Sequence, residues 1–542
     1  MNKNCTNCHK PFDITTDDSA FYVKMKVPEP TLCPDCRMQR LMCFRNERAL
    51  FKTKCALTGK EILSIYPPTA KATVYDQKVW MGDQWSALSY GQDFDFTKPF
   101  FDQFSELYFK VPRINLDNTN NENSDYCNDT SDQKNSYLCF NMHRGEDLYY
   151  CTTGGYGKDC VDLFWCIQCE LCYECTKTFE SYHCFWCFNS SNLSDCYFCE
   201  DSYSCKNCFG CIGLHQKEYH VYNKPVSRAQ FEQFISEFKF THQNIKKAQD
   251  KLSELRLQVP HKNLEIAQSE DCLGDYITNS KNCTQCFDVM HSQDAKYVWD
   301  AIVNDSYDCF NTGSMPATSL MYQCVGVYNS TNVKFCFRCD YCNDVNYCDY
   351  CSNCHDCFGC IGLKHKSYCI LNKQYSKQQY EELLPRILEP GEFLPAKLNA
   401  VGYNDSVAQY YMPLSREKAI AQGFNWNDYE SPKLDLESLD AKDLPDSIEE
   451  VSDDILNKRI KCEKDQKYFR ITAQELAFYK KHKISLPHLC HDCRHFARKA
   501  KMNPRVLYDG HCANCQTAFK TTYSPARSEK VYCEKCYFAE LA

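Results

Sequence analysis

Small side chains recur at every third position through the middle of the chain, and a column of cysteines returns every twelve residues. Seven of the eight places in this series between residues 127 and 211 hold cysteine, and the eighth holds Leu163. All fifteen cysteines from Cys127 to Cys211 share one phase of the three-residue step. A short fixed period is typical of a β-solenoid, in which each coil stacks on the last. The pattern predicts a narrow coil with twelve residues and four inward positions per turn.

An internal duplication predicts a second solenoid. Residues 187–211 reappear 149 positions later, and the cysteines from Cys309 to Cys369 again share one phase. Two outer columns accompany the first solenoid. An aromatic stripe is expected at Tyr137, Tyr149, Val161, Tyr173, Phe185, Tyr197 and Phe209. A polar column is expected at turns, where Asn and Asp tolerate a left-handed backbone, and comprises Asn135, Asp147, Asp159, Asp195 and Asn207.

Helices are expected to cover the open ends of these coils, because exposed sheet edges aggregate. Ser227 with Gln230, and Ser376 with Gln379, match capping boxes directly after each solenoid. Before the first solenoid, Trp80–Leu116 is rich in phenylalanine and tyrosine. We expect this aromatic stretch to pack as a cap on the first coil.

Paired cysteines at both ends of the chain have the spacing of zinc ribbons. The N-terminal set is Cys5, Cys8, Cys33 and Cys36, and the C-terminal set is Cys512, Cys515, Cys533 and Cys536. In such a ribbon, two Cys-x-x-Cys knuckles direct four thiolates at one tetrahedral ion. The expected cofactor is therefore Zn²⁺ at two complete sites.

The two ends are copies of one module, because a shift of 457 residues superimposes them without a gap. The shift reveals a third, impaired set: Cys462, Asp465, Cys490 and Cys493. Asp465 replaces a cysteine and is a candidate fourth ligand, with His488 or His491 as the alternative. A fourth set keeps only Cys55, beside Thr58, Asp76 and Val79. One thiolate cannot hold structural zinc, so this ribbon is expected to fold around Trp80 without metal.

These patterns together predict a mostly β protein in which duplicated zinc-ribbon pairs flank two tandem narrow β-solenoids with helical caps. The expected boundaries are 1–82 for a zinc-ribbon pair, 83–122 for the aromatic cap, 123–222 for the first solenoid, 223–270 for a helical cap and linker, 271–371 for the second solenoid, 372–427 for a helical cap region, 428–456 for an acidic linker and 457–542 for the second zinc-ribbon pair.

Cysteine use bears on the compartment. The chain has 42 cysteines among 542 residues, and its first residues contain no apolar leader. No stretch is long and apolar enough to span a membrane, so no membrane partner is expected. We expect a cytoplasmic protein with its thiols reduced or bound to metal. Disulfides in an exported protein are the alternative.

Charge raises the question of RNA. The formal net charge is −9, but Lys458–Ala542 contains 18 basic and 8 acidic residues, a charge near +10. The clustered basic residues, which are candidates for nucleic-acid binding, are Lys480, Lys481, Lys483, Arg494, Arg498, Lys499 and Lys501. Tyr479 and Phe496 lie among them and could stack on bases. A solvated basic surface is the simpler interpretation, and the acidic stretch Asp428–Asp454 could instead fold back and mask the patch.

The motifs resemble known architectures. The terminal cysteine pairs resemble zinc ribbons, and the twelve-residue coil is similar to the narrow β-helix of insect antifreeze proteins, without its regular Thr-x-Thr rows. With motifs such as Leu32-Cys33-Pro34-Asp35-Cys36-Arg37 and Val531-Tyr532-Cys533-Glu534-Lys535-Cys536-Tyr537, most of the chain resembles uncharacterised cysteine-rich, multi-ribbon proteins of candidate-phylum bacteria. This resemblance implies no activity.

Three functions remain after this reading. The chain has no phosphate-binding glycine loop, no His-Glu-x-x-His motif and no nucleophile elbow, so we expect no enzyme. The favoured hypothesis is a zinc-binding scaffold with a protein partner. The alternatives are binding of RNA or a ribonucleoprotein through the basic ribbons, and metal storage or redox buffering by the many thiols. The sequence leaves the oligomeric state open.

Overall fold

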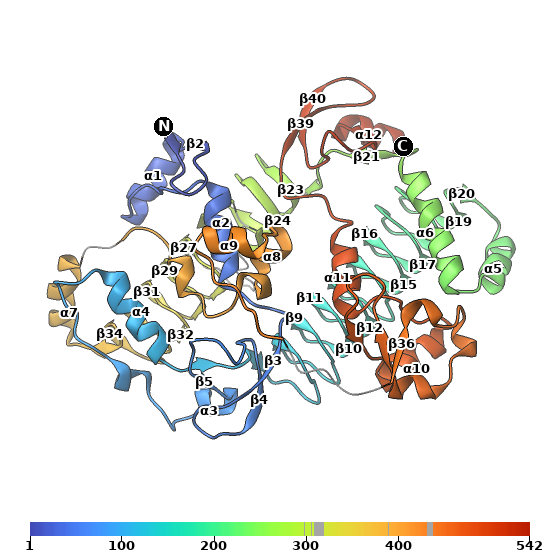
Figure 1. Cartoon of the computed structure of the whole chain (residues 1–542). Coiled ribbons are helices and arrows are strands. Elements are labelled where there is room, and N and C mark those ends of the chain that lie inside the picture. The colour runs from blue at the N-terminus through green and yellow to red at the C-terminus, as the bar shows by residue number, and fades with distance from the viewer. Residues whose placement is uncertain (298, 305, 308–318, 388–389, 431–436, 542) are drawn as a thin grey trace. The chain divides into compact units, whose positions relative to one another are not determined.

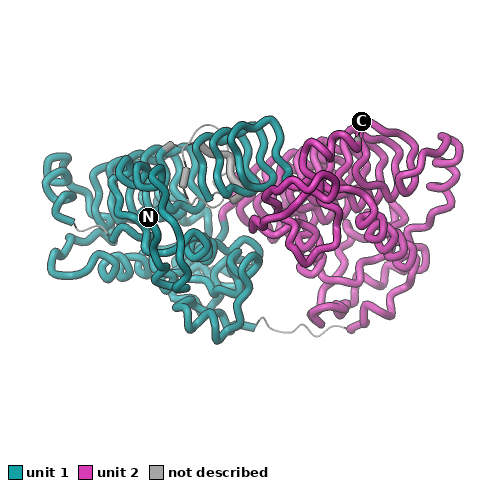
Figure 2. The backbone as a smooth tube through the Cα atoms, turned by 90° about the horizontal axis from the view of Figure 1, so that it is seen from above, with its two compact units in different colours: residues 1–116, 264–431 teal, residues 117–263, 432–542 magenta. Residues whose placement is uncertain are grey.

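The chain folds into two compact units, each made from two separate stretches of sequence (Figures 1 and 2). The computed structural model describes all residues except 298, 305, 308–318, 388–389, 431–436 and 542. Unit 1 comprises residues 1–116 and 264–431, and unit 2 comprises residues 117–263 and 432–542. Each unit contains one solenoid and one terminal cysteine-rich module, so the predicted mostly β fold is confirmed.

The first solenoid belongs to unit 2 and keeps the twelve-residue period without a break. Parallel strands pair with a shift of twelve, as in Cys184 with Cys196 and Cys196 with Cys208. One sheet contains β7 (Asn118–Thr119), β8 (Asn128–Ser131), β9 (Phe140–His143), β11 (Thr152–Gly155), β13 (Phe164–Ile167), β14 (Thr176–Phe179) and β16 (Phe188–Ser191). The other strands are β10 (Glu146–Tyr149), β12 (Lys158–Val161), β15 (Tyr182–Phe185), β17 (Ser194–Tyr197), β18 (Lys206–Phe209) and β19 (Glu218–Val221).

The second solenoid belongs to unit 1 and begins irregularly. Ile266 pairs with Ile277, eleven residues on, and the register shifts again at Gly274, whose φ is 155°. The twelve-residue register is regular from Ser319 onward. Its strands are β22 (Ile266–Ala267), β23 (Leu273–Thr278), β24 (Thr284–Gln293), β25 (Trp299–Asn304), β26 (Ser306–Tyr307), β27 (Ser319–Tyr322), β28 (Val327–Tyr328), β29 (Thr331–Lys334), β30 (Cys339–Asp340), β31 (Asn343–Asn346), β32 (Cys351–Ser352), β33 (His355–Phe358) and β34 (Ser367–Ile370). The predicted inward Cys309 lies outside the described residues.

Left-handed residues turn the coil at every third position. From Asp147 to Asp159, each third residue has a φ between 51° and 58°. The predicted turn column is confirmed, since Asn135 and Asn207 have φ values of 51° and 52°. Aromatic residues such as Trp186 adopt the same conformation, although it costs about 1 kcal/mol for a residue with a Cβ. Interactions in the lumen and between coils must offset this repeated cost.

Weak hydrogen bonds explain why cysteine fills the lumen. The Cys175 thiol donates to the carbonyl oxygen of Cys184 at 3.2 Å, nine residues ahead. Thr178 donates in the same way to the carbonyl of Cys187 at 3.3 Å. A lumen position therefore suits a small side chain that also carries a donor. Every described cysteine of the lumen is a separate thiol, and nearly all are fully buried.

The two terminal modules repeat each other element by element. In the first half of each module, α1 (Thr16–Met25) corresponds to α10 (Ala473–His482), and α2 (Pro34–Cys43) corresponds to α11 (His491–Lys499). Both α1 and α10 start with a capping box and end at a left-handed lysine. The other strands are β1 (Asn2–Asn4), β2 (Pro11–Asp13), β37 (Arg459–Lys461) and β38 (Tyr468–Phe469) in the first halves, and β3 (Phe51–Lys54), β4 (Glu61–Ser64), β39 (Tyr508–His511) and β40 (Ala518–Thr521) in the second. The predicted duplication is confirmed.

Each module packs on the solenoid that is more distant in sequence. The N-terminal module lies in unit 1 with the second solenoid, and the C-terminal module lies in unit 2 with the first. The aromatic stretch follows the same rule. Phe100 of α4 (Phe100–Lys110) contacts Tyr347 and Phe358, each at 4.9 Å between ring centroids. The expectation that this stretch caps the first coil is wrong, because its rings complete the core around the second solenoid.

The helices predicted after each solenoid are present. Helix α5 (Arg228–Glu237) starts at the Ser227 capping box, and α7 (Lys377–Leu383) starts at the Ser376 capping box. Helix α6 (His242–Arg256) follows α5. Phe234 and Phe238 pack on Phe209 at ring distances of 4.9 and 4.8 Å. In the described part of the chain, no helix combines the length and apolar character needed to cross a membrane.

The acidic stretch is not a linker where the structure describes it. Strand β36 (Ser438–Asp440) pairs with β37 of the C-terminal module. Apolar residues of the following segment are buried against the module and the first solenoid, namely Ala441, Leu444, Ile448, Val451 and Ile455. Burial of these residues corrects the predicted linker at 428–456, of which 431–436 lie outside the description. Their spacing of three and four residues was the signal in the sequence.

Candidate metal centres

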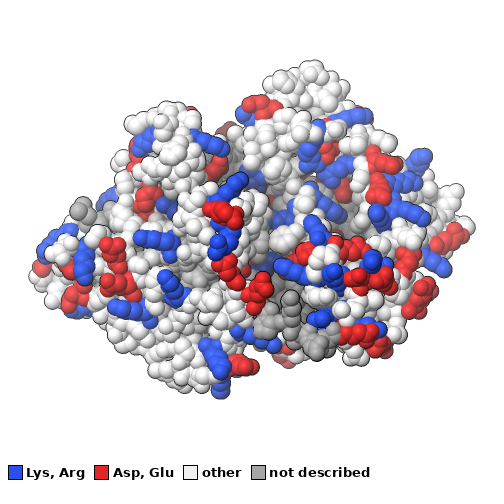
Figure 3. Space-filling model, viewed as in Figure 1, with Lys and Arg blue, Asp and Glu red and all other residues white. Residues whose placement is uncertain are grey.

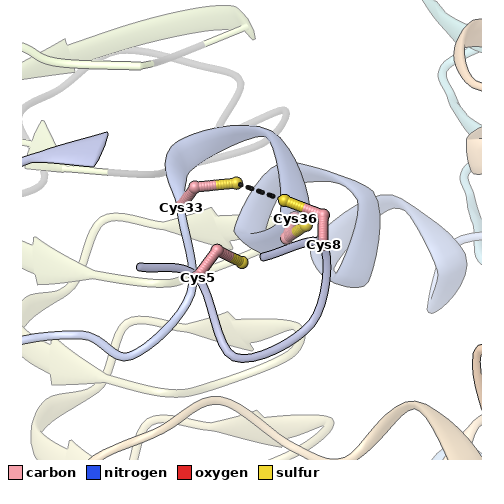
Figure 4. Close-up of side chains that lie close together, drawn as sticks. All are labelled: Cys5, Cys8, Cys33 and Cys36. Carbon is pink, nitrogen blue, oxygen red and sulfur yellow. Dashed lines mark hydrogen bonds between the residues drawn. The ribbon is translucent and has the colours of Figure 1, made fainter. Parts of the chain in front are cut away.

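Four thiols converge in the first half of the N-terminal module (Figure 4). Cys5 and Cys8 lie in the turn after β1, whereas Cys33 caps α2 and Cys36 lies in its first turn. The four sulfur atoms all lie within 4.8 Å of one another, and the Cys8 and Cys33 sulfurs are 3.6 Å apart. A tetrahedral zinc with Zn–S bonds near 2.3 Å requires sulfurs about 3.8 Å apart. The donor set and its spacing therefore fit one zinc ion.

The second half of the C-terminal module holds an equivalent group. Cys512, Cys515, Cys533 and Cys536 also place their sulfurs within 4.8 Å, and those of Cys515 and Cys533 are 3.7 Å apart. Cys512 is buried, whereas Cys515 is exposed. This group fits zinc as well as the first does, but lies closer to solvent.

Backbone amides favour the thiolate form at one cysteine of each group. Burial alone would raise the pKa of Cys5, but N–H donors of Cys8, Cys33 and Asn7 outweigh it and lower the pKa to about 6. The same balance lowers the pKa of Cys512 to about 6. Its sulfur accepts from the N–H groups of Cys515 at 3.5 Å and Cys533 at 3.3 Å. The thiols beside them have the opposite effect at other ligands, because Cys36 raises the pKa of Cys33 and Cys515 raises the pKa of Cys536 to about 12. A cation would therefore have to displace protons from the remaining thiols of each group.

The impaired set assembles around Asp465. A carboxylate oxygen of Asp465 lies within 4.8 Å of the sulfurs of Cys462, Cys490 and Cys493, and the contact to Cys490 is 3.7 Å. The histidine alternatives have other contacts. His488 stacks on His242 with ring centroids 3.6 Å apart, and His491 stacks on Tyr150 at 5.5 Å. The arrangement therefore favours Asp465 as the fourth ligand.

The ribbon around Cys55 has an aromatic core. Trp80 is buried with Tyr75, Ile114 and Cys55, as the sequence predicts for its central residue. The indole N–H of Trp80 donates to the Pro112 carbonyl at 3.0 Å. The Cys55 sulfur accepts from the N–H of Asp76 at 3.3 Å, where the other ribbons have a metal-ligand cysteine. Packing and a hydrogen bond thus occupy the place that cysteine side chains have in the other ribbons.

The candidate nucleic-acid residues do not form one surface. Arg494 and Arg498 are 4% and 1% exposed and pair with acidic residues of the first solenoid. The prediction that these two arginines bind RNA is therefore wrong, because both are buried between the module and the first solenoid, where RNA cannot contact them. Tyr479 is fully buried and cannot stack on a base.

The remaining lysines differ in their exposure and in their partners. Lys480 pairs with Asp453 at 2.5 Å, so the acidic segment does fold back on part of the patch. Lys481 and Lys483 are exposed, and Lys499 and Lys501 are half-buried. On the face seen in Figure 3, basic and acidic side chains are interspersed. Part of the basic cluster seen in the sequence is therefore buried or paired with acidic side chains.

Sequence reasoning missed the acidic partners Asp162 and Glu174. They lie twelve residues apart in one column of the first solenoid, which was a detectable signal. Arg494 and Arg498, four residues apart, lie on one face of α11.

Comparison with known proteins gives no family for the chain. No protein-family model matches it, and no curated protein sequence is similar to it.

Proposed function

We propose that the protein is a non-enzymatic scaffold whose terminal modules are held by structural zinc and whose solenoids provide rigid supports. The convergence of four thiols at Cys5, Cys8, Cys33 and Cys36 carries this proposal. Four thiolates complete a tetrahedral shell, so such a zinc has no open position for a substrate. The ion would staple a small module that has little apolar core of its own.

Zinc is the metal that these donors favour. Thiolates select soft or borderline ions, and a tetrahedral set of four is typical of zinc or an iron–sulfur cluster. We propose Zn²⁺ at the two four-cysteine groups and, more weakly held, at the group with Asp465. Helices α2 and α11 begin at ligand cysteines. A bound ion would therefore hold in place the helix that packs on each solenoid.

The thiol-storage alternative receives less support. Among described residues, the groups of three or more potential ligands within 4.8 Å are the three at the termini. The lumen thiols instead donate to backbone carbonyls, as Cys196 does to Cys205 at 3.6 Å. We propose that they are packing residues kept reduced in a cytoplasmic compartment. Counting reactive thiols in denatured, chelator-treated protein tests this, and a requirement for reductant at half of the 42 would contradict it.

A partner is part of the proposal, and we propose a protein. Affinity capture of the full chain, with and without nuclease and with and without a zinc chelator, tests it. Specific protein partners should survive nuclease and be lost when the chelator disorders the modules. Captured material that nuclease releases, and that salt weakens, would instead favour the RNA alternative.

A further inference from the structure

The contact between module and solenoid uses corresponding residues in both units. In unit 2, Tyr479 of α10 packs on Tyr173 of the first solenoid at 5.8 Å between ring centroids. In unit 1, Tyr22 of α1 packs on Tyr322 of the second solenoid at 5.4 Å. These residues correspond under the same shifts of 457 and 149 that relate the copies in sequence. The duplicated surfaces therefore meet in the same register, and differences between them can be compared position by position.

Charge defines the contact in unit 2. Arg494 approaches Asp162 at 2.8 Å, and Arg498 approaches Asp162 at 2.9 Å and Glu174 at 3.2 Å. Asp162 is fully buried, and the Glu174 side chain is 17% exposed. Glu475 adds a third carboxylate, which accepts hydrogen bonds from Tyr150 and Tyr479. Two guanidiniums of one helix thus form ion pairs with two carboxylates on successive coils.

In unit 1, Arg37 matches Arg494, and the match of Asp162 lies outside the described residues, so the two contacts are compared at the positions of Arg498 and Glu174. Leu41 stands where the C-terminal module has Arg498, and it is fully buried. Gln323 stands where the first solenoid has Glu174, and it accepts a hydrogen bond from Arg40 at 2.8 Å. The ion pair of this contact lies elsewhere, between Asp18 of α1 and Lys296 at 2.5 Å. In the first solenoid, the residue that corresponds to Lys296 is Asp147.

We infer that these substitutions form a pairing code, by which each module recognises the solenoid it packs on and is rejected by the other. The C-terminal module on the second solenoid would bury Arg498 against the neutral Gln323. The N-terminal module on the first solenoid would keep a cation at Glu174, because Arg40 reaches the matching Gln323 in unit 1, so the rejection of this pairing rests on Asp18. Asp18 would then face Asp147 instead of a lysine. A buried charge without its partner is strongly unfavourable, so both exchanged pairings are excluded.

The code accounts for the exchanged connectivity of the units. The N-terminal module directly precedes the first solenoid in sequence, yet it packs on the second. Proximity along the chain would favour the neighbouring solenoid, because a shorter connection costs less entropy on closure. The charges select the distant partner instead. The surface formed by Asp162 and Glu174 is thus specific for a helix that presents two arginines four residues apart.

A double-mutant cycle in the full-length protein tests this inference. Arg498→Leu leaves Glu174 without its guanidinium and should increase amide hydrogen exchange in α11 by tenfold or more. Glu174→Gln leaves Arg498 paired with Asp162 alone and should cause a smaller increase. The double variant recreates the Leu41 and Gln323 combination of unit 1 and should restore exchange to within about threefold of the parent. Effects that simply add, or an Arg498→Leu variant that exchanges like the parent, would overturn the inference.

A second double-mutant cycle introduces the arginine and the glutamate at the matching positions of unit 1. Its outcome does not depend on whether the first variants fold. Leu41→Arg should increase exchange in α2, and Gln323→Glu added to it should reverse that increase. A carbodiimide cross-link between Asp18 and Lys296 reports whether the N-terminal module stays on its solenoid, and it should persist in all Arg498 variants. As a control, Arg416→Leu with Asp428→Asn breaks an exposed pair and should show no coupling. If Gln323→Glu fails to rescue Leu41→Arg, charge does not specify the pairing.

Discussion

The two units contain the same parts but hold them together differently. In unit 1, the first half of the module keeps four ligand cysteines and the second half has a tryptophan core. In unit 2, the first half has three cysteines with Asp465, and the second half keeps all four. The half of unit 2 that has Asp465 in place of a cysteine also has buried ion pairs of Arg494 and Arg498 with Asp162. Potential metal ligands and side-chain packing are therefore distributed differently between the two copies of the module.

Removing a metal ligand should have the largest effect, and the effect should differ between the second halves of the two modules. Cys512→Ser should cost one zinc and unfold residues 508–541, because metal binding can supply about 10 kcal/mol of folding free energy to such a module. Cys55→Ser at the corresponding position should leave the metal content unchanged and cost less than about 1 kcal/mol. Metal analysis and hydrogen exchange measure both. Equal losses in the two variants would show that the halves are stabilised alike.

Removing the central aromatic residue should instead destabilise the half with the tryptophan core more than the half with four cysteines. Trp80→Ala should destabilise its half of the module by about 3–5 kcal/mol, because it removes a buried indole and its hydrogen bond. Tyr537 stands at the corresponding position beside the Cys533 and Cys536 ligands. Tyr537→Ala should cost less, about 1–2 kcal/mol, since zinc still holds that half. Denaturant titration followed by hydrogen exchange measures both. A larger loss of stability for Tyr537→Ala would contradict the idea that packing stabilises one half where zinc stabilises the other.

The carboxylates at one matched position should respond to pH in opposite ways. Burial raises the pKa of Asp18, but hydrogen bonds from Lys296 and Thr15 outweigh it and leave the pKa below its usual value. Burial raises the pKa of Glu475 by more than Arg494 lowers it, since three carboxylates share two guanidiniums. The stability from Asp18 is therefore present above its unfolded pKa near 3.9 and is lost as pH falls through the lower folded value.

For Glu475 the sign reverses, because the folded state binds the proton more tightly than the unfolded state. Unit 2 should gain stability as pH falls through the raised folded pKa, down to the unfolded value near 4.3. Glu475→Gln should remove this dependence and cost less than about 1 kcal/mol, whereas Asp18→Asn should cost about 3 kcal/mol by leaving Lys296 unpaired. Denaturation with zinc in excess at several pH values tests this. A pH-independent parent would refute it.

The smallest effect concerns the ligand that differs between the first halves. Asp465→Cys should complete the third four-thiolate group and tighten its metal at least tenfold, which is about 1.4 kcal/mol. The matched change Cys8→Asp should weaken the N-terminal site by a similar factor. Competition with a chromophoric chelator measures both affinities. An unchanged affinity after Asp465→Cys would mean that Asp465 is not the fourth ligand.

Local periodicity made much of this fold predictable from sequence. The twelve-residue step predicted the strand register of the first solenoid and that of the second from Ser319 onward. The shift of 457 located all four ribbons and their surviving ligands. The left-handed residues at every third position were predicted only where Asn or Asp marks them. Trp186 and Tyr150 adopt the same conformation because the coil imposes it, and no local preference reports this.

Tertiary partners were beyond local patterns. The sequence places the N-terminal module beside the first solenoid, and only the charges at Glu174, Gln323, Leu41 and Arg498 indicate otherwise. Arg498 in a lysine-rich stretch suggested an RNA surface, whereas its carboxylate partners lie more than 300 residues away in sequence. Periodicity predicts what an element is, but the complementarity of two surfaces decides where it packs.

The zinc content of the full chain tests the account most directly. Protein purified under reducing conditions should be analysed by elemental mass spectrometry and by native mass spectrometry. The account predicts three zinc ions per chain, of which the ion at Cys462, Asp465, Cys490 and Cys493 leaves first when chelator is added. Fewer than two zinc ions, iron as the main metal, or a metal content that rises far above three would contradict it.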